Sequence, residues 1–261
     1  MIRARALAVI VMLAAVAAAA QTAPKKVRII LVGDSTMQPK SGYGPGFCAD
    51  MTADVECVNV ARGGRSSGSY RAEGLWDKVM ESLAQNSGYK ATYVLIQFGH
   101  NDQPGKPGRS TDLATEFPAN MKRYAEEVKS AGAIPILVTP LTRRQWNKDG
   151  TFNRSLEPWA EATRKVAAET HTTLIDLFAV SAAAIEKMGP DEANTMAQAP
   201  PPPPTPKEGE GAAPPPTADP NAPKFDYTHL GAKGSEYFGR MMVDLLVKVR
   251  PELKPYVTTK N

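Results

Sequence analysis

The sequence is poor in the residues from which metal centres and disulfide-rich scaffolds are built. Its 261 residues include only two cysteines, Cys48 and Cys57, and three histidines, at positions 100, 171 and 229. These side chains lack the spacing of metal-ligand motifs, which argues against a structural metal site. In an oxidising compartment the two cysteines could form one disulfide, and two buried thiols are an equally open alternative.

Long apolar runs are also missing, except at the amino terminus. There Arg3 and Arg5 precede an apolar run over residues 6–20 that ends in small residues suited to cleavage. This arrangement predicts a secretory signal peptide over residues 1–20. A membrane anchor is the alternative, but the run is mostly alanine and is shorter than the ~20 residues needed to span a bilayer. We therefore expect residues 21–261 to be secreted or periplasmic, without further membrane contact.

Neither sign of charge dominates the sequence. The formal net charge of +4 falls to +2 without Arg3 and Arg5, and no basic run is interleaved with aromatic residues. Nucleic acid is therefore not an expected partner. A weakly basic exported protein is compatible with an acidic polymer as substrate, although the charge alone does not indicate one.

Five short apolar runs rich in β-branched residues alternate with segments of helical periodicity. The runs predict strands at residues 27–32, 55–61, 92–98, 133–138 and 172–177. Helices are expected at residues 47–52, about 75–86, 117–131, 155–170, 180–188 and 232–249. On the last helix, the stripe expected to be buried consists of Tyr237, Met241, Leu245 and Val249. This alternation predicts the α/β class, with a five-stranded parallel sheet in a three-layer α/β/α sandwich.

The composition changes between residues 189 and 224, where prolines cluster among alanine, glycine and glutamate. Such a tract cannot bury a core, and it predicts a disordered insertion at about residues 190–224. An interdomain linker is the alternative, but the roughly forty residues after the tract are too few to fold alone in most cases. We therefore expect a single domain over residues 21–261.

The first predicted strand leads into Gly33-Asp34-Ser35, which places a hydroxyl at its carboxyl end. Ligands of open α/β sheets bind at the carboxyl ends of the strands, so Ser35 is a candidate nucleophile. Because Asp-Ser-Thr is also an ordinary helix start, this motif alone leaves a turn or a cap open.

A serine nucleophile needs a base, and histidine is the side chain best suited near neutral pH. His171 is expected at a helix end in a capping or solvated role, and His100 has only Asp102 nearby to orient it. His229 differs, because Asp226 lies three residues before it and both can project from one turn. Asp226 could hold the Nδ1 proton of His229 while Nε2 faces the serine. The alternative is a helix cap beside an incidental histidine.

Acyl transfer also needs hydrogen-bond donors for the developing oxyanion. Gly64 follows the second predicted strand and could present a backbone N–H, and Asn101 follows the third and could present its amide. Each could instead be an ordinary turn residue. Their order along the chain favours the catalytic interpretation, because it brings all these groups to one edge of a parallel sheet.

Four blocks thus stand in order along the chain. They are Gly33-Asp34-Ser35, Gly63-Gly64-Arg65-Ser66, Gly99-His100-Asn101-Asp102 and Asp226-x-x-His229. These blocks resemble those of the SGNH (GDSL) hydrolases, and the chain is most similar to their rhamnogalacturonan acetylesterase branch. Supporting stretches are Gly33-Asp34-Ser35-Thr36-Met37, Glu73-Gly74-Leu75-Trp76-Asp77-Lys78, Gln97-Phe98-Gly99-His100-Asn101-Asp102 and Thr139-Pro140-Leu141-Thr142-Arg143-Arg144. The resemblance covers about residues 27–249, interrupted by the proline-rich tract.

The resemblance implies the flavodoxin-like SGNH hydrolase fold and an esterase without metal or other cofactor. By that resemblance Ser35 is the nucleophile, His229 the general base and acid, and Asp226 its orienting carboxylate. The oxyanion hole would consist of the Ser35 N–H, the Gly64 N–H and the Asn101 amide. Gly63 is the alternative to Gly64, because the doubled glycine leaves the register open by one residue.

The expected function is an exported serine esterase that removes O-acetyl groups from a plant cell-wall polysaccharide through an acyl-enzyme intermediate. Pectic rhamnogalacturonan is the first candidate, and we expect a monomer whose partner is the acetylated polysaccharide or oligosaccharide. Alternatives are an esterase for xylan or peptidoglycan, a lysophospholipase-type lipid esterase and a non-catalytic glycan-binding protein. Polar, glycine-rich loops without an apolar lid argue against lipid, and the complete catalytic set argues against a role in binding alone.

Overall fold

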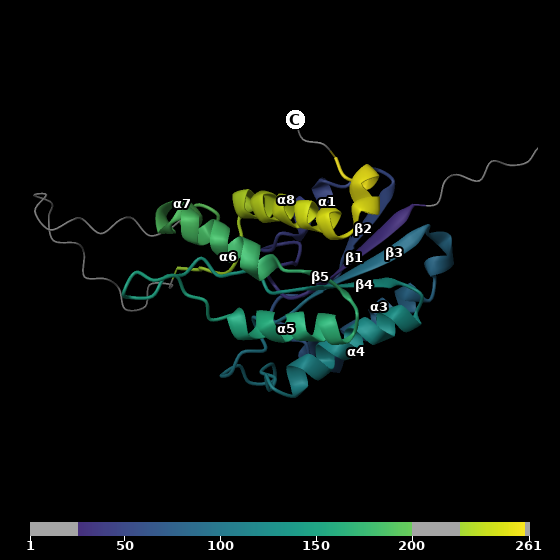
Figure 1. Cartoon of the computed structure of the whole chain (residues 1–261), viewed down its shortest axis with the longest axis horizontal. Helices are drawn as coiled ribbons and strands as arrows, with labels where there is room; N and C mark the ends of the chain where they lie inside the picture. Colours follow the sequence, from purple (N-terminus) through teal and green to yellow (C-terminus); the bar gives the residue numbers. More distant parts are fainter. Residues whose placement is uncertain (1–25, 200–224, 259–261) are drawn as a thin grey trace, which may run out of the picture.

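The computed structural model describes residues 26–199 and 225–258. The predicted signal peptide and the greater part of the predicted insertion lie outside these residues. A five-stranded sheet forms the centre of the described structure, in the order β2-β1-β3-β4-β5, and every neighbouring pair is parallel (Figure 1). The strands are β1 (Val27–Gly33), β2 (Val55–Asn59), β3 (Ala91–Gln97), β4 (Ile134–Val138) and β5 (Thr173–Ile175). The predicted fold class is confirmed.

The strand β1 is flanked by β2 and β3, and all seven of its residues are buried. Because side chains alternate along a strand, Ile29 and Leu31 join a hydrophobic cluster on one face of the sheet. Ile30 and Val32 join a second cluster on the other face. A strand buried on both faces has a continuous apolar sequence, which is why the sequence pattern located it.

Helices cover both faces of the sheet and complete the three layers (Figure 1). One face is covered by α1 (Gly44–Ala49), α6 (Leu177–Met188) and α8 (Ala232–Val249). The other is covered by α3 (Leu75–Leu83), α4 (Glu116–Ser130) and α5 (Glu157–Glu169). Shorter helices are α2 (Ser69–Ala72), α7 (Pro190–Asn194) and two 3₁₀ segments, η1 (Asn86–Gly88) and η2 (Pro251–Tyr256). Within residues 26–199 and 225–258, no helix has the length and hydropathy of a membrane span.

The last helix, α8, has its predicted bounds, but its predicted buried stripe is wrong. Phe238 and Met242 are fully buried, whereas Tyr237 is 36% exposed and the other three predicted residues are only partly buried. Contact with α1 explains the difference, since a Cβ on Gly239 would lie 2.4 Å from the backbone nitrogen of Phe47. Only glycine allows two backbones to approach so closely. This contact sets Gly239 against α1, and its neighbours Phe238 and Met242 join the hydrophobic cluster on that face of the sheet.

The first ten residues of the predicted insertion are ordered, contrary to the expectation. Residues 190–199 include α7, and Ala193 and Met196 are buried. Ala197 pairs with Leu230 in an antiparallel bridge, so this segment packs beside the chain that follows the insertion. Burial of these two apolar side chains offsets the entropy of ordering the segment, and proline content alone does not encode that burial. Residues 200–224 lie outside the described part of the chain.

Cys48 and Cys57 form a disulfide, with their Cα atoms 5.6 Å apart. Of the two alternatives that the sequence left open, the structure thus shows the bridge. It ties α1 to the edge strand β2, next to the face on which α8 packs.

Candidate active site

The predicted nucleophile, Ser35, lies in a tight turn directly after β1. Asp34 Oδ1 accepts the backbone N–H of Thr36 at 2.9 Å and the Thr36 hydroxyl at 2.8 Å, and this turn ends the strand. A Cβ on Gly33 would lie 2.7 Å from the carbonyl oxygen of Gln97, so glycine is needed where β1 meets β3. Ser35 is 7% exposed and lies at the carboxyl end of the first strand, as predicted. The structure shows that this strand is flanked on both sides.

A buried chain of hydrogen bonds fixes this turn to the neighbouring strand. Gln97 at the end of β3 donates from Nε2 to Thr36 Oγ1 at 2.7 Å. Its Oε1 accepts the hydroxyl of Tyr43 at 2.9 Å. Burial raises the pKa of Tyr43, so its hydroxyl stays protonated and remains the donor. The chain pairs polar groups that would otherwise be costly to bury.

The structure places the carboxylate of Asp34, rather than that of Asp102, beside His100. Asp34 Oδ2 lies 3.3 Å from His100 Nδ1, and both side chains are buried. Burial lowers the pKa of His100 more than the nearby Asp34 raises it, so the ring is neutral at pH 7. Sequence proximity suggested only Asp102, because the true neighbour of His100 follows a different strand.

Asp102 instead joins the loops that follow β2 and β3. Its carboxylate accepts the Ser67 hydroxyl at 2.6 Å, the Gly99 N–H at 3.0 Å and the Thr111 hydroxyl at 2.8 Å. Burial raises the pKa of Asp102 to about 6. Its role in the structure is therefore to hold the two loops together, and it does not orient His100.

The two predicted oxyanion donors lie on loops that contact each other. Asn101 Nδ2 donates to the carbonyl oxygen of Arg65 at 3.0 Å, and the amide carries a second hydrogen for another acceptor. Gly64 has a φ of +78°, a conformation that favours glycine. The N–H of Gly63 donates to Gln38 Oε1 at 2.7 Å. This bond favours Gly64 over Gly63 as the backbone donor for an oxyanion.

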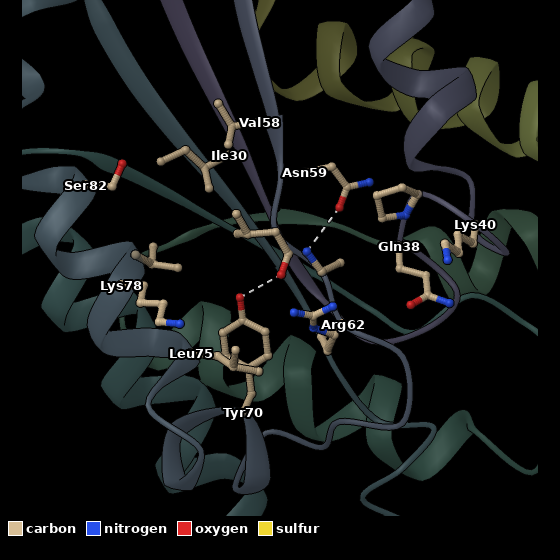
Figure 2. Close-up of a pocket in the computed structure, with 14 residues that line it drawn as sticks. Ile30, Gln38, Lys40, Val58, Asn59, Arg62, Tyr70, Leu75, Lys78 and Ser82 are labelled. Carbon is tan, nitrogen blue, oxygen red and sulfur yellow. Dashed lines mark hydrogen bonds between the residues drawn. The ribbon is translucent and has the colours of Figure 1, made fainter.

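Two contacts hold the chain between β2 and these glycines. The Tyr70 hydroxyl donates to the carbonyl oxygen of Val60 at 2.9 Å (Figure 2). The backbone N–H of Arg62 donates to the carbonyl oxygen of Gly33 at 2.9 Å. This second bond continues the ladder between β1 and β2, so the glycine loop begins beside the turn that carries the serine.

The structure brings Asp226 and His229 together. Asp226 Oδ2 lies 2.6 Å from His229 Nδ1, and Oδ1 accepts the N–H of Thr228 at 2.8 Å and of His229 at 2.9 Å. Burial raises the pKa of Asp226, but the hydrogen bonds from His229 and Thr228 lower it further, to below its usual value. The carboxylate is therefore charged at neutral pH and can hold the Nδ1 proton. The helix-cap alternative fails, because the N-cap residue of α8 is Gly231.

Ser41 ties the serine turn to the histidine loop. Its hydroxyl donates to the carbonyl oxygen of Ser35 at 3.0 Å, and its own carbonyl oxygen accepts the N–H of Leu230 at 2.8 Å. Ser41 Oγ also accepts a hydrogen bond from Gln38 Nε2 at 2.7 Å. Ser41 is thus hydrogen-bonded both to Ser35 and to Leu230, the residue after His229. These bonds keep the two loops at the same edge of the sheet.

Arg144 supports the loop of Asp226 and His229 through hydrogen bonds to its backbone, a role that the sequence analysis did not predict. Its guanidinium is fully buried and donates to the carbonyl oxygens of Asp226 at 3.0 Å, Thr228 at 3.4 Å and His229 at 2.8 Å. Its backbone N–H donates to the Tyr227 carbonyl oxygen at 2.9 Å. Burial lowers the pKa of Arg144 to about 10, so the group remains charged at neutral pH. The adjacent pair of arginines was the available signal, but it does not show which one is buried.

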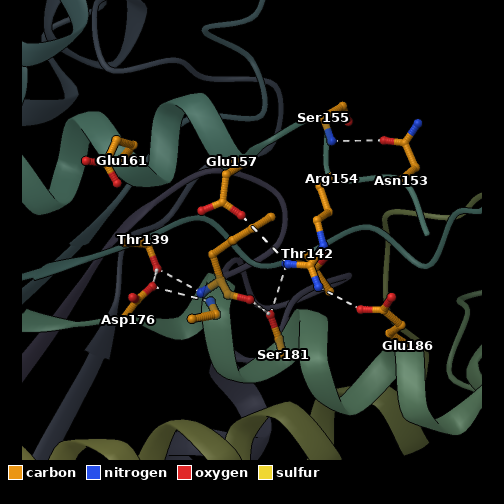
Figure 3. Close-up of polar contacts among 12 residues, drawn as sticks. Thr139, Thr142, Asn153, Arg154, Ser155, Glu157, Glu161, Asp176, Ser181 and Glu186 are labelled. Atoms are coloured by element: carbon orange, nitrogen blue, oxygen red, sulfur yellow. Dashed lines mark hydrogen bonds and ion pairs between the residues drawn. The ribbon is translucent and has the colours of Figure 1, made fainter. Parts of the chain in front are cut away.

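The loop that carries this arginine is anchored at the end of β4 (Figure 3). Thr139 Oγ1 donates to Asp176 Oδ1 at 3.0 Å, and the Thr142 N–H donates to Ser181 Oγ at 3.2 Å. Asp176 also pairs with Arg164 of α5, whose Nε lies 2.8 Å from Oδ2. These contacts join β4, α5 and α6 at the start of the loop and fix the backbone that carries Arg144.

Cationic side chains gather on the loops after β2 and β3. Arg65 directly follows Gly64, and Lys106 donates from Nζ to the carbonyl oxygen of His100. A Cβ on Gly64 would lie 3.5 Å from Arg109 Nη1. Within the described residues Arg109 forms no ion pair, so its charge is available to an anionic ligand. His171, the third histidine, is exposed and has a φ of 49° in the turn before β5, far along the chain from these loops.

Comparison with known proteins gives consistent matches. The model of the GDSL-like Lipase/Acylhydrolase family matches residues 31–236. The chain is 28% identical over 246 residues to the rhamnogalacturonan acetylesterase RhgT of Bacillus subtilis, covering 91% of this chain and 97% of the relative. It is 29% identical over 174 residues to the probable rhamnogalacturonan acetylesterase YesY of the same organism, covering 64% of this chain and 77% of the relative.

Solved structures match the fold. The crystal structure of YXIM_BACsu from Bacillus subtilis superposes with a TM-score of 0.66 at 22% identity, covering 89% of this chain and 59% of that chain. The acetylxylan esterase Axe2 from Geobacillus stearothermophilus superposes with a TM-score of 0.57 at 16% identity, covering 85% of this chain and 95% of that chain. At these identities the likeness shows the shared fold alone.

Proposed function

The chain belongs to the GDSL-like lipase/acylhydrolase family, and we propose that it removes O-acetyl groups from a plant cell-wall polysaccharide, with pectic rhamnogalacturonan as its substrate. Carboxylic ester hydrolysis follows from the family and from the acetylesterases among its relatives. The observation that carries the catalytic assignment is the contact of 2.6 Å between Asp226 and His229. Ser41 joins their loop to the turn of Ser35, the proposed nucleophile.

In the proposed reaction the Ser35 oxygen attacks the acetyl carbonyl carbon while His229 Nε2 takes the serine proton. Asp226 holds the Nδ1 proton and stabilises the imidazolium that forms. The carbonyl oxygen becomes an oxyanion, which the Ser35 N–H, the Gly64 N–H and the Asn101 amide stabilise. His229 then gives its proton to the sugar oxygen as the ester bond breaks. Water releases acetate from the acetylated serine by the same steps in reverse, and these steps require no metal or other cofactor.

Charge supports a pectic substrate. A pectic polymer carries uronate carboxylates, whereas the main chain of xylan is neutral. The free charge of Arg109 lies beside Gly64 and would attract a uronate next to the reacting ester. The relatives named as rhamnogalacturonan acetylesterases agree with this choice.

Three further proposals concern the whole chain. We propose that residues 1–20 direct export and that residues 21–261 act as one domain and as a monomer. The charged start and apolar run of the first twenty residues support export. The shared sheet and the close α1–α8 contact support one domain. Mass determination of the amino terminus of the secreted protein tests export, and analytical ultracentrifugation tests the monomer. A single cooperative thermal transition is expected of one domain.

Acetate release from acetylated rhamnogalacturonan, acetylated xylan and a neutral aryl acetate tests the substrate proposal. We expect the highest kcat/KM on the pectic polymer, and Arg109→Gln should raise KM for that polymer alone. Lys165→Gln, which removes an exposed charge on α5, is the matched control and should change neither value. Preference for xylan would contradict the pectic substrate, and binding without hydrolysis would contradict the esterase.

A further inference from the structure

A cavity of about 560 Å³ opens beside the edge strand β2 (Figure 2). Ile30 of β1, Val58 of β2 and Val60 form one wall, and Leu75 and Val79 of α3 form the facing wall. All five side chains are aliphatic. Because β2 has a sheet partner on one side only, the cavity stays open to solvent.

The polar groups between these walls are already paired. The Tyr70 hydroxyl donates to the carbonyl oxygen of Val60 at 2.9 Å, and burial raises the pKa of Tyr70, so the hydroxyl stays protonated. Val60 itself is 37% exposed, which leaves a large apolar side chain at the mouth of a concave surface. A concave apolar surface of this volume is typical of small-molecule sites. The lining therefore favours the apolar part of a ligand.

Three cations stand around the cavity. Lys40, Arg62 and Lys78 contribute to its lining, and all three are exposed. Within residues 26–199 and 225–258 none of them forms an ion pair. Of the described residues that line the cavity, none is acidic. The rim therefore attracts an anion and disfavours a cationic ligand.

We propose that this cavity binds an alkyl carboxylate of medium chain length, with its chain between β2 and α3 and its carboxylate at the cationic rim. Aliphatic walls match an alkyl chain, and unpaired cations match one negative group. The site is distinct from the proposed ester site. Gln38 lies between them, since it lines the cavity and its Oε1 accepts the N–H of Gly63.

Isothermal titration of the mature protein with sodium decanoate, below the concentration at which it forms micelles, tests the proposal. We expect saturable binding of one decanoate per chain and at least tenfold weaker binding of decanol and of decyltrimethylammonium. Because one exposed charge contributes little, the test variant is the double substitution Lys40→Glu and Lys78→Glu, which should weaken binding by about tenfold. The control is Lys165→Glu and Lys187→Glu, which reverses two exposed helix lysines elsewhere and should leave binding unchanged.

Two further variants distinguish decanoate binding in this cavity from non-specific electrostatic binding and from binding at the proposed ester site. Val60→Trp fills the mouth without changing charge and should abolish decanoate binding. Ser35→Ala should bind decanoate as the wild type does, and the lysine double variant should still hydrolyse aryl acetate. Absence of saturable binding would overturn the proposal. Equal weakening in the control lysine variant, unchanged binding in Val60→Trp, or loss of binding in Ser35→Ala would each overturn it as well.

Discussion

Replacing Asp226 by asparagine separates the proposed orienting role of this carboxylate from its structural one. Asp226 Oδ1 accepts the N–H groups of Thr228 and His229 at 2.8 and 2.9 Å, and an asparagine Oδ1 can accept both. The asparagine Nδ2 would then occupy the place of Oδ2, 2.6 Å from His229 Nδ1. Because this nitrogen donates, the imidazole proton moves to Nε2. That tautomer cannot accept the proton of Ser35.

The expected loss is about 10⁴-fold in kcat, the size found when a triad histidine is held in the wrong tautomer. Stability should change little, because the turn keeps its two backbone bonds and the carboxyl is more than a third exposed. The folded-state pKa of Asp226 is depressed, so its stabilising effect is present above the unfolded pKa of 3.8 and is lost as the pH falls. At pH 7 we expect a loss of ~1 kcal/mol or less.

Acetate release at pH 7, measured beside a thermal melt, checks both expectations. Asp244→Asn is the matched control, because it removes an exposed carboxylate on α8 that pairs with Arg240 at 2.7 Å. This control should keep wild-type kcat. An active Asp226→Asn protein with the wild-type pH profile would refute the orienting role, whereas an unfolded one would show that the turn depends on the charge.

Three other outcomes follow from the same geometry. Asn101→Ala should lower kcat by ~10²–10³ with little change in KM, since the amide would act on charge present only in the transition state; a raised KM at constant kcat would contradict this. Arg144→Met removes the donor of three carbonyl oxygens, although the His229 oxygen keeps the N–H of Gln198, and we expect ~3 kcal/mol less stability and a kcat ~10²-fold lower as the histidine loop shifts. Wild-type stability and wild-type kcat in Arg144→Met would show that the histidine loop does not depend on the Arg144 guanidinium. Burial raises the pKa of Asp102 to about 6, so the contribution of this group to the free energy of unfolding falls as the pH rises from 3.8 toward 6. A titration midpoint of the Asp102 carboxyl below 4, measured by NMR, would contradict the raised pKa.

The sheet and the order of the proposed catalytic blocks were predictable from the sequence, because local patterns encode both. Continuous apolar runs occur where strands are buried on two faces, as in β1. The blocks around Ser35 and Asn101 follow such runs directly, whereas the block around Gly64 follows the partly exposed edge strand β2. Parallel topology then brings their ends to one edge without further information.

The errors concern contacts between distant segments. The periodicity of α8 fits two adjacent stripes, and the approach of Gly239 to α1 decides between them. The partner of His100 is Asp34, which follows another strand. Nothing local distinguishes buried Arg144 from its neighbour Arg143. Each of these features depends on which elements pack together, which a single sequence does not state.

The most direct test of the account is acetate release from acetylated rhamnogalacturonan by Ser35→Ala, measured beside wild type and Ser130→Ala. Ser130 is an exposed serine at the end of α4 and serves as the control for a lost hydroxyl. We expect no release above background from Ser35→Ala, full activity from Ser130→Ala and the same melting temperature for all three. Release at a wild-type rate by a folded Ser35→Ala protein would contradict the proposed nucleophile and the mechanism derived from it.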